Sequence, residues 1–215
     1  MPEQIELCNL ELPGRGKRIS EPLLRSIEEM TEDLYEQIKN KLNERYIIYG
    51  HSLGALLSYT LCRHIQGVEE KLPKALFVSG QRAPSLLKSD DTHLLPDGAF
   101  MDVLRGMNGT PEELLSDESF VKYFLPVIRS DFRSISEYRY KPAEKKLNVS
   151  FEIFTGADEN ITDDEILGWQ IETTAQVKFH KLHGGHFFIF DHIPELCGRF
   201  ESFAEGRKSD VRERV

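Results

Sequence analysis

A serine between two glycines, Ser52 in the run Gly50–Gly54, separates a β-rich run from an apolar helical segment, and this arrangement constrains the fold more than any other feature. The preceding run, Arg45–Tyr49, is typical of a strand buried on both faces. Apolar residues continue at helical spacing over Leu53–Ile65, and a second β-rich run follows at Lys74–Ser79. Strand, helix and strand in this order predict a βαβ unit, and therefore a sheet that is at least partly parallel.

Segments on either side of this unit extend the pattern. Alternating or continuous apolar residues predict strands, and apolar residues three and four positions apart predict helices. Gly206 is placed to end the last helix, and the charged tail 207–215 is expected to fray. The predicted strands are Ile5–Leu12, Asn148–Phe154 and Ala175–Leu182, and the predicted helices are Glu21–Leu42, Ile161–Glu172 and Ile193–Glu205.

Between residues 94 and 145 the pattern changes to short helical segments that are broken by Gly106, Gly109 and Pro126. We interpret this region as a helical insertion, or lid, that lies over the sheet. Residues 1–215 are then one domain that carries the lid within it. The predicted lid helices are Ala99–Met107, Pro111–Leu115, Glu118–Ser130 and Arg133–Tyr138.

Composition and charge exclude several classes of protein. The 215 residues carry 27 basic against 36 acidic side chains, a net charge of −9, which argues against nucleic acid or an anionic membrane surface as the main partner. No apolar run approaches the roughly 20 residues that cross a bilayer. Cys8, Cys62 and Cys197 have no metal-like spacing and no signal peptide precedes them, so we expect reduced thiols in a cytoplasmic protein.

Ser52 has the sequence surroundings of a nucleophile. In the pattern Gly-x-Ser-x-Gly, the serine sits on a turn so tight that side chains at both flanking positions would clash, which accounts for Gly50 and Gly54. The turn presents the hydroxyl at the N-terminus of the following helix, where free backbone N–H groups stabilise an oxyanion. The N–H of Leu53 is the expected donor.

A serine nucleophile needs a base, and the chain order serine, acid, histidine predicts a late one. His186 follows the last predicted strand through a turn with two glycines, which let its loop fold back toward Ser52. His183 is the second candidate. His51 is expected to be a packing or hydrogen-bonding neighbour of Ser52 rather than its base.

The third member of such a triad is a carboxylate just past the penultimate strand, where it holds the imidazole in its useful tautomer. Asp158 and Glu159 lie together in the turn after Asn148–Phe154. Neighbouring side chains in a turn point in different directions, so only one of them can face the histidine. The residues alone do not separate the two.

With these three turns in order, the chain resembles the type II thioesterases, the discrete editing thioesterases of nonribosomal peptide and polyketide synthases. The resemblance implies the α/β-hydrolase fold, a mostly parallel sheet flanked by helices with a helical lid at about residues 94–145. Similar blocks run from Leu12 to Phe188, and their joint order is more specific than any one of them. The blocks are Leu12–Arg18 with Glu21-Pro22, Gly50–Ala55, Phe77–Pro84, Leu125–Phe132, Trp169 and Gly184–Phe188.

Two features depart from the family pattern. The family usually begins with one more strand and a Pro-x-Ala-Gly-Gly-type loop, which supplies a second oxyanion donor and is missing from this sequence. One such donor contributes roughly 3 kcal/mol, so its loss would cost about two to three powers of ten in rate. Relatives also usually place an aspartate three residues after the glycine, the position of Glu159 here. By this register the resemblance favours Glu159, since triads accept glutamate, and Asp158 stays the alternative.

The resemblance implies a serine hydrolase that clears acyl groups from the phosphopantetheine arm of an acyl or peptidyl carrier protein, with no metal and no bound cofactor. His186 would take the proton of Ser52 as the serine attacks the thioester. Two alternatives stay open. An inactive, N-terminally truncated protein would bind a carrier protein without turnover, whereas a general esterase or acyl-CoA thioesterase would prefer oxygen esters or other substrates.

Carrier proteins are typically acidic, and this chain is acidic too, so docking needs local basic groups or apolar contacts near the lid. Arg15, Lys17 and Arg18 are candidates, although three cations in one turn are more often a solvated loop. Apolar residues of the lid either line an acyl pocket or, as we favour, form the buried faces of its helices. They are Phe100, Met101, Leu104, Phe120 and Phe124.

Overall fold

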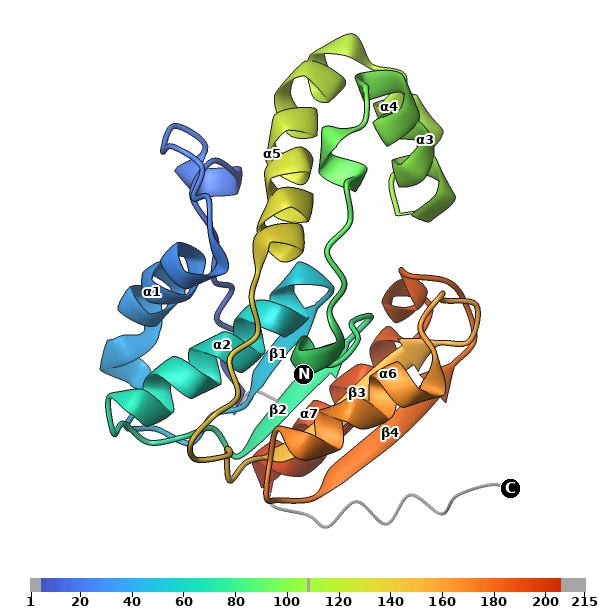
Figure 1. Ribbon diagram of the computed structural model, residues 1–215. Coiled ribbons are helices and arrows are strands. Elements are labelled where there is room, and N and C mark those ends of the chain that lie inside the picture. The colour runs from blue at the N-terminus through green and yellow to red at the C-terminus, as the bar shows by residue number, and fades with distance from the viewer. Residues whose placement is uncertain (1–4, 108, 206–215) are drawn as a thin grey trace.

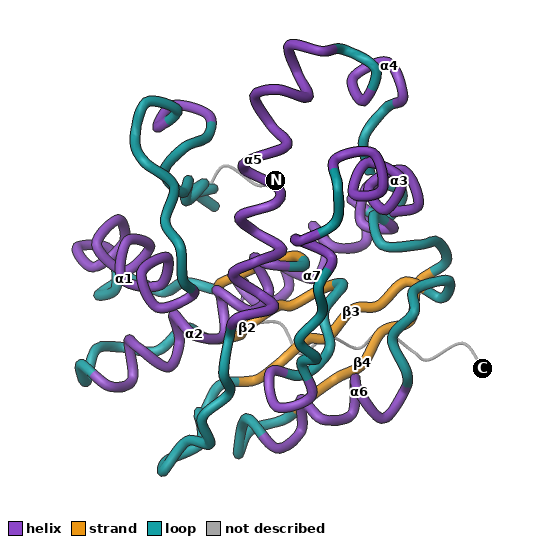
Figure 2. The backbone as a smooth tube through the Cα atoms, turned by 45° about the horizontal axis from the view of Figure 1, so that its top comes forward, coloured by secondary structure: helices purple, strands orange, loops and turns teal. Residues whose placement is uncertain are grey.

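Four parallel strands form the centre of the computed structural model, which describes residues 5–107 and 109–205. They lie side by side in the order β1-β2-β3-β4 (Figures 1 and 2). In register, Gly50 is opposite Val78 and Ile153 is opposite Phe179. The predicted βαβ unit and parallel sheet are therefore confirmed. The strands are β1 (Ile48–His51), β2 (Ala75–Ser79), β3 (Ser150–Gly156) and β4 (Val177–Leu182).

Helices cover both faces of the sheet, and three of them rise above its upper end (Figure 1). Helices α2 and α6 pack on one face, α7 packs on the other, and α1 lies outside α2. None of the helices in the described part of the chain is long and apolar enough to cross a membrane. The helices are α1 (Ile27–Ile38), α2 (Leu53–Gly67), α3 (Asp97–Met107), α4 (Glu112–Leu115), α5 (Glu118–Glu137), α6 (Asp163–Leu167) and α7 (Ile193–Glu205).

The core follows from the alternation of side chains along the central strands. In β2, Leu76 and Val78 pack with Trp169 on the α2 side, whereas Ala75 and Phe77 pack against α7. All five residues of β2 are buried. A strand that is apolar at every position needs helices on both faces, and this requirement accounts for the layered arrangement.

The predicted strand at Ile5–Leu12 is wrong. Residues 5–12 have no regular secondary structure. The backbone N–H and C=O of Glu11 are bound by the side-chain amide of Gln37 instead of by a neighbouring strand. Leu12 nevertheless packs into the apolar cluster between α1 and α2.

Two further boundaries differ from the prediction. Helix α1 begins at Ile27 rather than near Glu21, because the Ser26 side chain caps it by accepting a hydrogen bond from the N–H of Glu29. Strand β1 is an edge strand within the described sheet, and Tyr49 is 37% exposed, so the prediction that this run is buried on both faces is wrong. Gly206 and the tail 207–215 lie outside the described residues.

Helices α3, α4 and α5 form a lobe with its own apolar centre (Figure 1). Phe100, Met101 and Leu104 are buried in it, as favoured from the sequence, whereas Phe124 is 36% exposed and stacks on Phe120. The predicted break at Pro126 is wrong, since α5 continues through this residue. Pro126 is exposed, so only a backbone hydrogen bond is lost and no core side chain is displaced.

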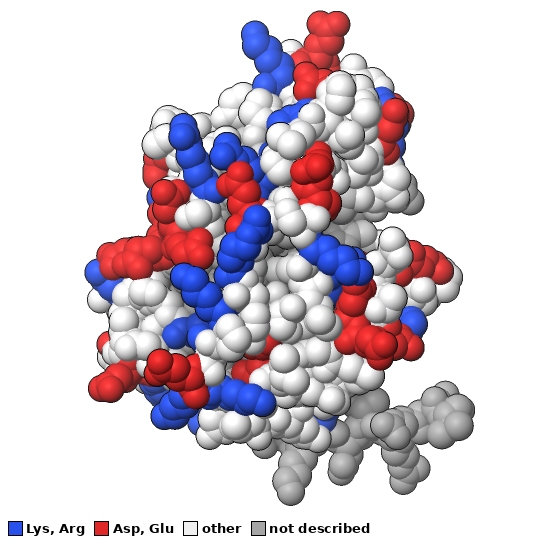
Figure 3. Space-filling model, in the orientation of Figure 1, with Lys and Arg blue, Asp and Glu red and all other residues white. Residues whose placement is uncertain are grey.

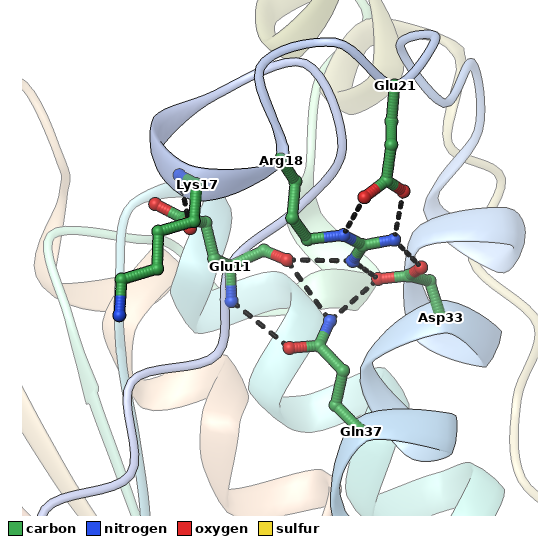
Figure 4. Close-up of polar contacts among 6 residues, drawn as sticks. All are labelled: Glu11, Lys17, Arg18, Glu21, Asp33 and Gln37. Atoms are coloured by element: carbon green, nitrogen blue, oxygen red, sulfur yellow. Dashed lines mark hydrogen bonds and ion pairs between the residues drawn. The ribbon is translucent and has the colours of Figure 1, made fainter.

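A network around Arg18 joins the N-terminal segment to α1 (Figure 4). The Arg18 guanidinium donates to both carboxylate oxygens of Asp33, to both of Glu21 and to the carbonyl of Glu11. This pairing holds the pKa of Asp33 below its ordinary value, chiefly through the hydrogen bonds from Arg18. Arg18 is therefore engaged within the protein and is not a solvated loop cation.

We expect Pro126→Ala to raise the free energy of unfolding by about 1–3 kcal/mol, because alanine restores the missing N–H in the middle of α5. Urea denaturation followed by circular dichroism measures the change. A less stable variant with fewer helical residues would contradict the continuous helix described above.

We expect Arg18→Ala to lower the free energy of unfolding by about 1–2 kcal/mol at neutral pH. The stabilisation depends on ionised Asp33, whose pKa is lowered on folding, so it is present above about pH 4 and is lost as the pH falls through that lowered pKa. In the variant, the free energy of unfolding should therefore fall less steeply as the pH is lowered below about 4. Arg25→Ala, which removes an exposed cation nearby, is the matched control and should leave that slope intact.

Candidate active site

Ser52 occupies a sharp turn between β1 and α2. Its backbone has φ 54° and ψ −118°, a left-handed conformation that residues other than glycine rarely adopt. Its N–H donates to the carbonyl of Ser79 at 2.9 Å, which ties the turn to the end of β2. A strained residue held between a strand and a helix in this way presents its side chain at a fixed point above the sheet.

The two glycines around Ser52 have different roles. An added Cβ at Gly50 would lie 1.9 Å from the carbonyl oxygen of Gly54 and 2.3 Å from Ser58 Oγ, so the expected clash is confirmed there. At Gly54 an added Cβ would meet nothing within 4 Å, so the clash expected at that position is wrong. The turn requires glycine on the strand side, where α2 passes closest to β1.

Leu53 begins α2. The first N–H groups of a helix have no acceptor within the helix, and its dipole places partial positive charge at the same end. The backbone at Leu53 therefore lies where the sequence places an oxyanion donor. The side-chain amide of Gln81, from the segment after β2, also reaches this turn and donates to the Ser52 carbonyl at 3.5 Å.

Glu159 and His186 meet at the same edge of the sheet. Oε1 of Glu159 lies 2.7 Å from Nδ1 of His186, and Oε2 accepts the N–H of Gly156 at 2.7 Å. The Glu159 side chain is 3% exposed and that of His186 is 16% exposed. Both carboxylate oxygens are thus engaged, and the imidazole keeps Nε2 for another partner.

The structure separates the two acids that the sequence left together. Asp158 is exposed, and its backbone N–H donates to the carbonyl of Gly184, which brings the acidic turn against the histidine loop. It is the side chain of Glu159, one residue later, that points toward His186. The backbone contact of Asp158 and the carboxylate of Glu159 together join the turn after β3 to the loop after β4.

The other candidate histidines are engaged elsewhere. His183 is exposed at the surface, and its carbonyl accepts from Nε2 of His192. His180 pairs with buried Glu152 between β3 and β4. Within residues 5–107 and 109–205, no group of three or more His, Cys, Asp or Glu side chains is arranged to hold a metal ion.

His51 is a packing neighbour of the site. Its Nδ1 lies 2.9 Å from Ser79 Oγ, and its ring lies 4.8 Å from that of His186. Burial, and then the nearby His186, lower the pKa of His51 to about 3, so its ring is neutral at physiological pH. Sequence reasoning missed Ser79, although its place at the end of β2, beside the serine turn in a parallel sheet, is a usable signal.

Comparison with known proteins gives the same result from an independent direction. The model of the thioesterase domain family matches residues 1–204. The gramicidin S biosynthesis protein GrsT of Aneurinibacillus migulanus is 35% identical over 197 residues, which cover 91% of this chain and 77% of GrsT.

Solved structures agree. The type II thioesterase BorB from the borrelidin biosynthetic cluster is similar with a TM-score of 0.82 and 32% identity, over 90% of this chain and 79% of BorB. ClbQ from the colibactin pathway is similar with a TM-score of 0.83 and 31% identity, over 92% of this chain and 84% of ClbQ. A strand-bound serine turn, a parallel sheet flanked by helices and these likenesses lead to one conclusion: the chain belongs to the thioesterase family, as a type II thioesterase with the α/β-hydrolase fold.

Proposed function

We propose that this thioesterase hydrolyses acyl thioesters on the phosphopantetheine arm of carrier proteins, with Ser52, His186 and Glu159 as its catalytic triad. The observation that carries the triad is the hydrogen bond between Glu159 Oε1 and His186 Nδ1. It selects the tautomer in which Nε2 of His186 can accept a proton, and it stabilises the imidazolium that forms. The kinship with GrsT, BorB and ClbQ, which belong to antibiotic and related biosynthetic pathways by name, supports the choice of carrier-bound substrates.

In this mechanism Ser52 Oγ attacks the thioester carbonyl while its proton passes to Nε2 of His186. The resulting oxyanion accepts a hydrogen bond from the N–H of Leu53. The carbon–sulfur bond then breaks, and the pantetheine sulfur leaves with the proton from His186. Water attacks the acyl-serine, again losing its proton to His186, and the free acid departs as Ser52 regains its hydroxyl.

We propose that the α3–α5 lobe acts as a lid over this site. Gly109, between α3 and α4, lies so close to the Phe187 ring that an added Cβ would come within 1.9 Å of it, and Phe187 follows His186 directly. On the other side, Arg15 binds Asp131 of α5 through two hydrogen bonds of 2.9 Å. The lobe is thus fastened to the N-terminal loop and rests on the histidine loop.

Docking of an acidic carrier protein does not rely on Arg15 or Arg18, since both guanidinium groups form internal ion pairs. On the face in Figure 3, acidic and basic side chains are interspersed, so this face offers no broad cationic surface. Apolar contacts fit better. Phe190 and Ile193 are 61% and 52% exposed, and Phe190 stacks on Phe187 beside His186.

We also propose that the protein acts in the cytoplasm, because all three cysteines are free thiols.

We expect Ser52→Ala to reduce release of free acid from an acetyl-loaded carrier protein by at least about three powers of ten, because the acyl-serine cannot form. The measurement compares the wild-type chain and the variant at equal concentration, with circular dichroism to verify folding. Equal activity of the two would exclude Ser52 as nucleophile.

The same assay separates the alternatives. Faster turnover of an oxygen ester with the same acyl group would indicate a general esterase. Binding of the loaded carrier protein without any turnover would indicate an inactive carrier-binding protein. Ser52-dependent release from the carrier protein supports the proposed function.

We expect Glu159→Gln to lower kcat by about two to four powers of ten, because the amide can hold the imidazole in the wrong tautomer. Asp158→Asn is the matched control: it makes the same chemical change one residue away, at an exposed side chain, and should leave kcat unchanged. If Asp158→Asn were the more damaging of the two, the acid of the triad would have to be reassigned.

A further inference from the structure

The His51 ring, next to Ser52 in the chain, is held by a side-chain hydrogen bond and by burial. The ring is largely buried, Nδ1 contacts Ser79 Oγ at 2.9 Å, and Nε2 is buried without a hydrogen-bond partner among the described residues. Nε2 therefore makes no hydrogen bond to Ser52, and His51 does not serve as its base. Because only Nδ1 is paired within the described part of the chain, packing against neighbouring rings holds the rest of the His51 ring.

Ser79 links His51 to the serine turn. It is the last residue of β2 and is 1% exposed. Its hydroxyl contacts His51 Nδ1 and also lies 3.0 Å from the hydroxyl of Tyr49, while its carbonyl accepts the N–H of Ser52. One buried residue thus fixes both the His51 ring and the backbone of the nucleophile.

The rings of His51 and His186 share one support. Their centroids are 4.8 Å apart with an interplanar angle of 42°. Gly80 has φ +62°, and a Cβ added there would lie 2.5 Å from Cε1 of His51 and 3.3 Å from Cε1 of His186. The absence of a side chain at Gly80 lets both rings settle against the end of β2.

The hydrogen bond that Nδ1 of His186 donates to Glu159 fixes only one atom of the ring. A ring held at Nδ1 alone can still tilt about that contact, which would displace Nε2 from the serine hydroxyl. The His51 ring fills the space on one side and limits this tilt, and Phe187 packs against both rings at 5.0 and 5.6 Å. Because His51 stays neutral, it does not repel the imidazolium that forms on His186.

We propose that His51, anchored by Ser79, is a positioning residue that holds the imidazole of His186 in its catalytic orientation. The expected effect of His51 on turnover rests on the proposed function. Its effect on the orientation of the His186 ring rests on geometry alone. The same geometry assigns roles to Ser79 and Gly80, which belong to no part of the triad: Ser79 anchors the positioning ring, and Gly80 leaves room for it.

The test compares His51→Leu, Ser79→Ala and the double variant by two measurements. The first is the downfield proton resonance of the hydrogen bond between His186 Nδ1 and Glu159, which reports the ring geometry without any turnover. The second is kcat and KM on an acyl-loaded carrier protein. Ser79→Ala is the smaller change and provides an answer even if His51→Leu folds poorly.

We expect the resonance to shift or broaden in both single variants, and kcat of His51→Leu to fall by about tenfold to hundredfold with little change in KM, since a misplaced catalytic group costs rate rather than binding. The kcat of Ser79→Ala should fall less than that of His51→Leu. The double variant should match His51→Leu, because Ser79 acts through His51 and its loss adds nothing once the ring is gone.

Thr31→Val is the matched control. It deletes a hydroxyl that is also buried, at 5% exposure, but this one lies between α1 and α2, where it bonds to Thr60. It should lower thermal stability without moving the resonance or kcat. A merely structural role for Ser79 would give the same pattern as Thr31→Val.

An unchanged resonance in His51→Leu would overturn the positioning role, whatever the activity. Additive losses in the double variant would also overturn it. If the resonance responds as expected but neither the wild-type chain nor any variant releases acid, the positioning role stands and the proposed function fails. The two proposals are therefore separable in one set of samples.

Discussion

The strained turn at Ser52 is the constraint on which the site depends. A left-handed serine is stable only where the surrounding structure holds it, and here β1, α2 and the Ser79 carbonyl do so together. The close approach of Gly50 to the first turn of α2 leaves no room for another residue on the strand side. The burial of α2 against the sheet offsets this strain, so the placement of Ser52 depends on the stability of the core.

A parallel sheet brings three further segments to the edge where that turn lies. The carboxyl ends of all four strands face the same edge, so the segments after β1, β2, β3 and β4 contribute Ser52, Gly80, Glu159 and His186 in turn. Backbone hydrogen bonds join these segments, as between Asp158 and Gly184 and between Ser52 and Ser79. Glu159 and His186 meet because they follow two neighbouring strands, β3 and β4.

The two arginines of the N-terminal turn bind within the protein. Arg15 and Arg18, two cations of one turn, bind Asp131 and Asp33 and thereby fasten the N-terminal segment to α5 and α1. These arginines are already paired within the protein. The net charge of −9 therefore does not indicate where a partner docks. The exposed apolar side chains near the histidine loop are a better guide, because burying them on docking is favourable whatever the sign of the partner's charge.

Much of the fold could be predicted from local pattern. The βαβ unit and α7 are decided by apolar periodicity that burial then satisfies, and the Gly-x-Ser-x-Gly pattern marks a turn that few other sequences can form. Local pattern failed where a tertiary partner decided the outcome. Residues 5–12 alternate like a strand, but Gln37 from α1 takes the backbone groups of Glu11. Pro126 signals a break, but α5 continues through it on its exposed side.

The sequence by itself determined the class of fold, the position of Ser52 and the loop that carries His186, because these depend on spacing along the chain. The register of the family resemblance favoured Glu159, and the tertiary structure decided which acid faces the histidine. Asp158 and Glu159 are adjacent and chemically alike. The backbone contact between the acidic turn and Gly184, with the bond from the N–H of Gly156 to the Glu159 carboxylate, holds the turn so that Glu159 points inward. The tertiary structure also placed His51 against His186, a contact between residues 135 positions apart that no local pattern encodes.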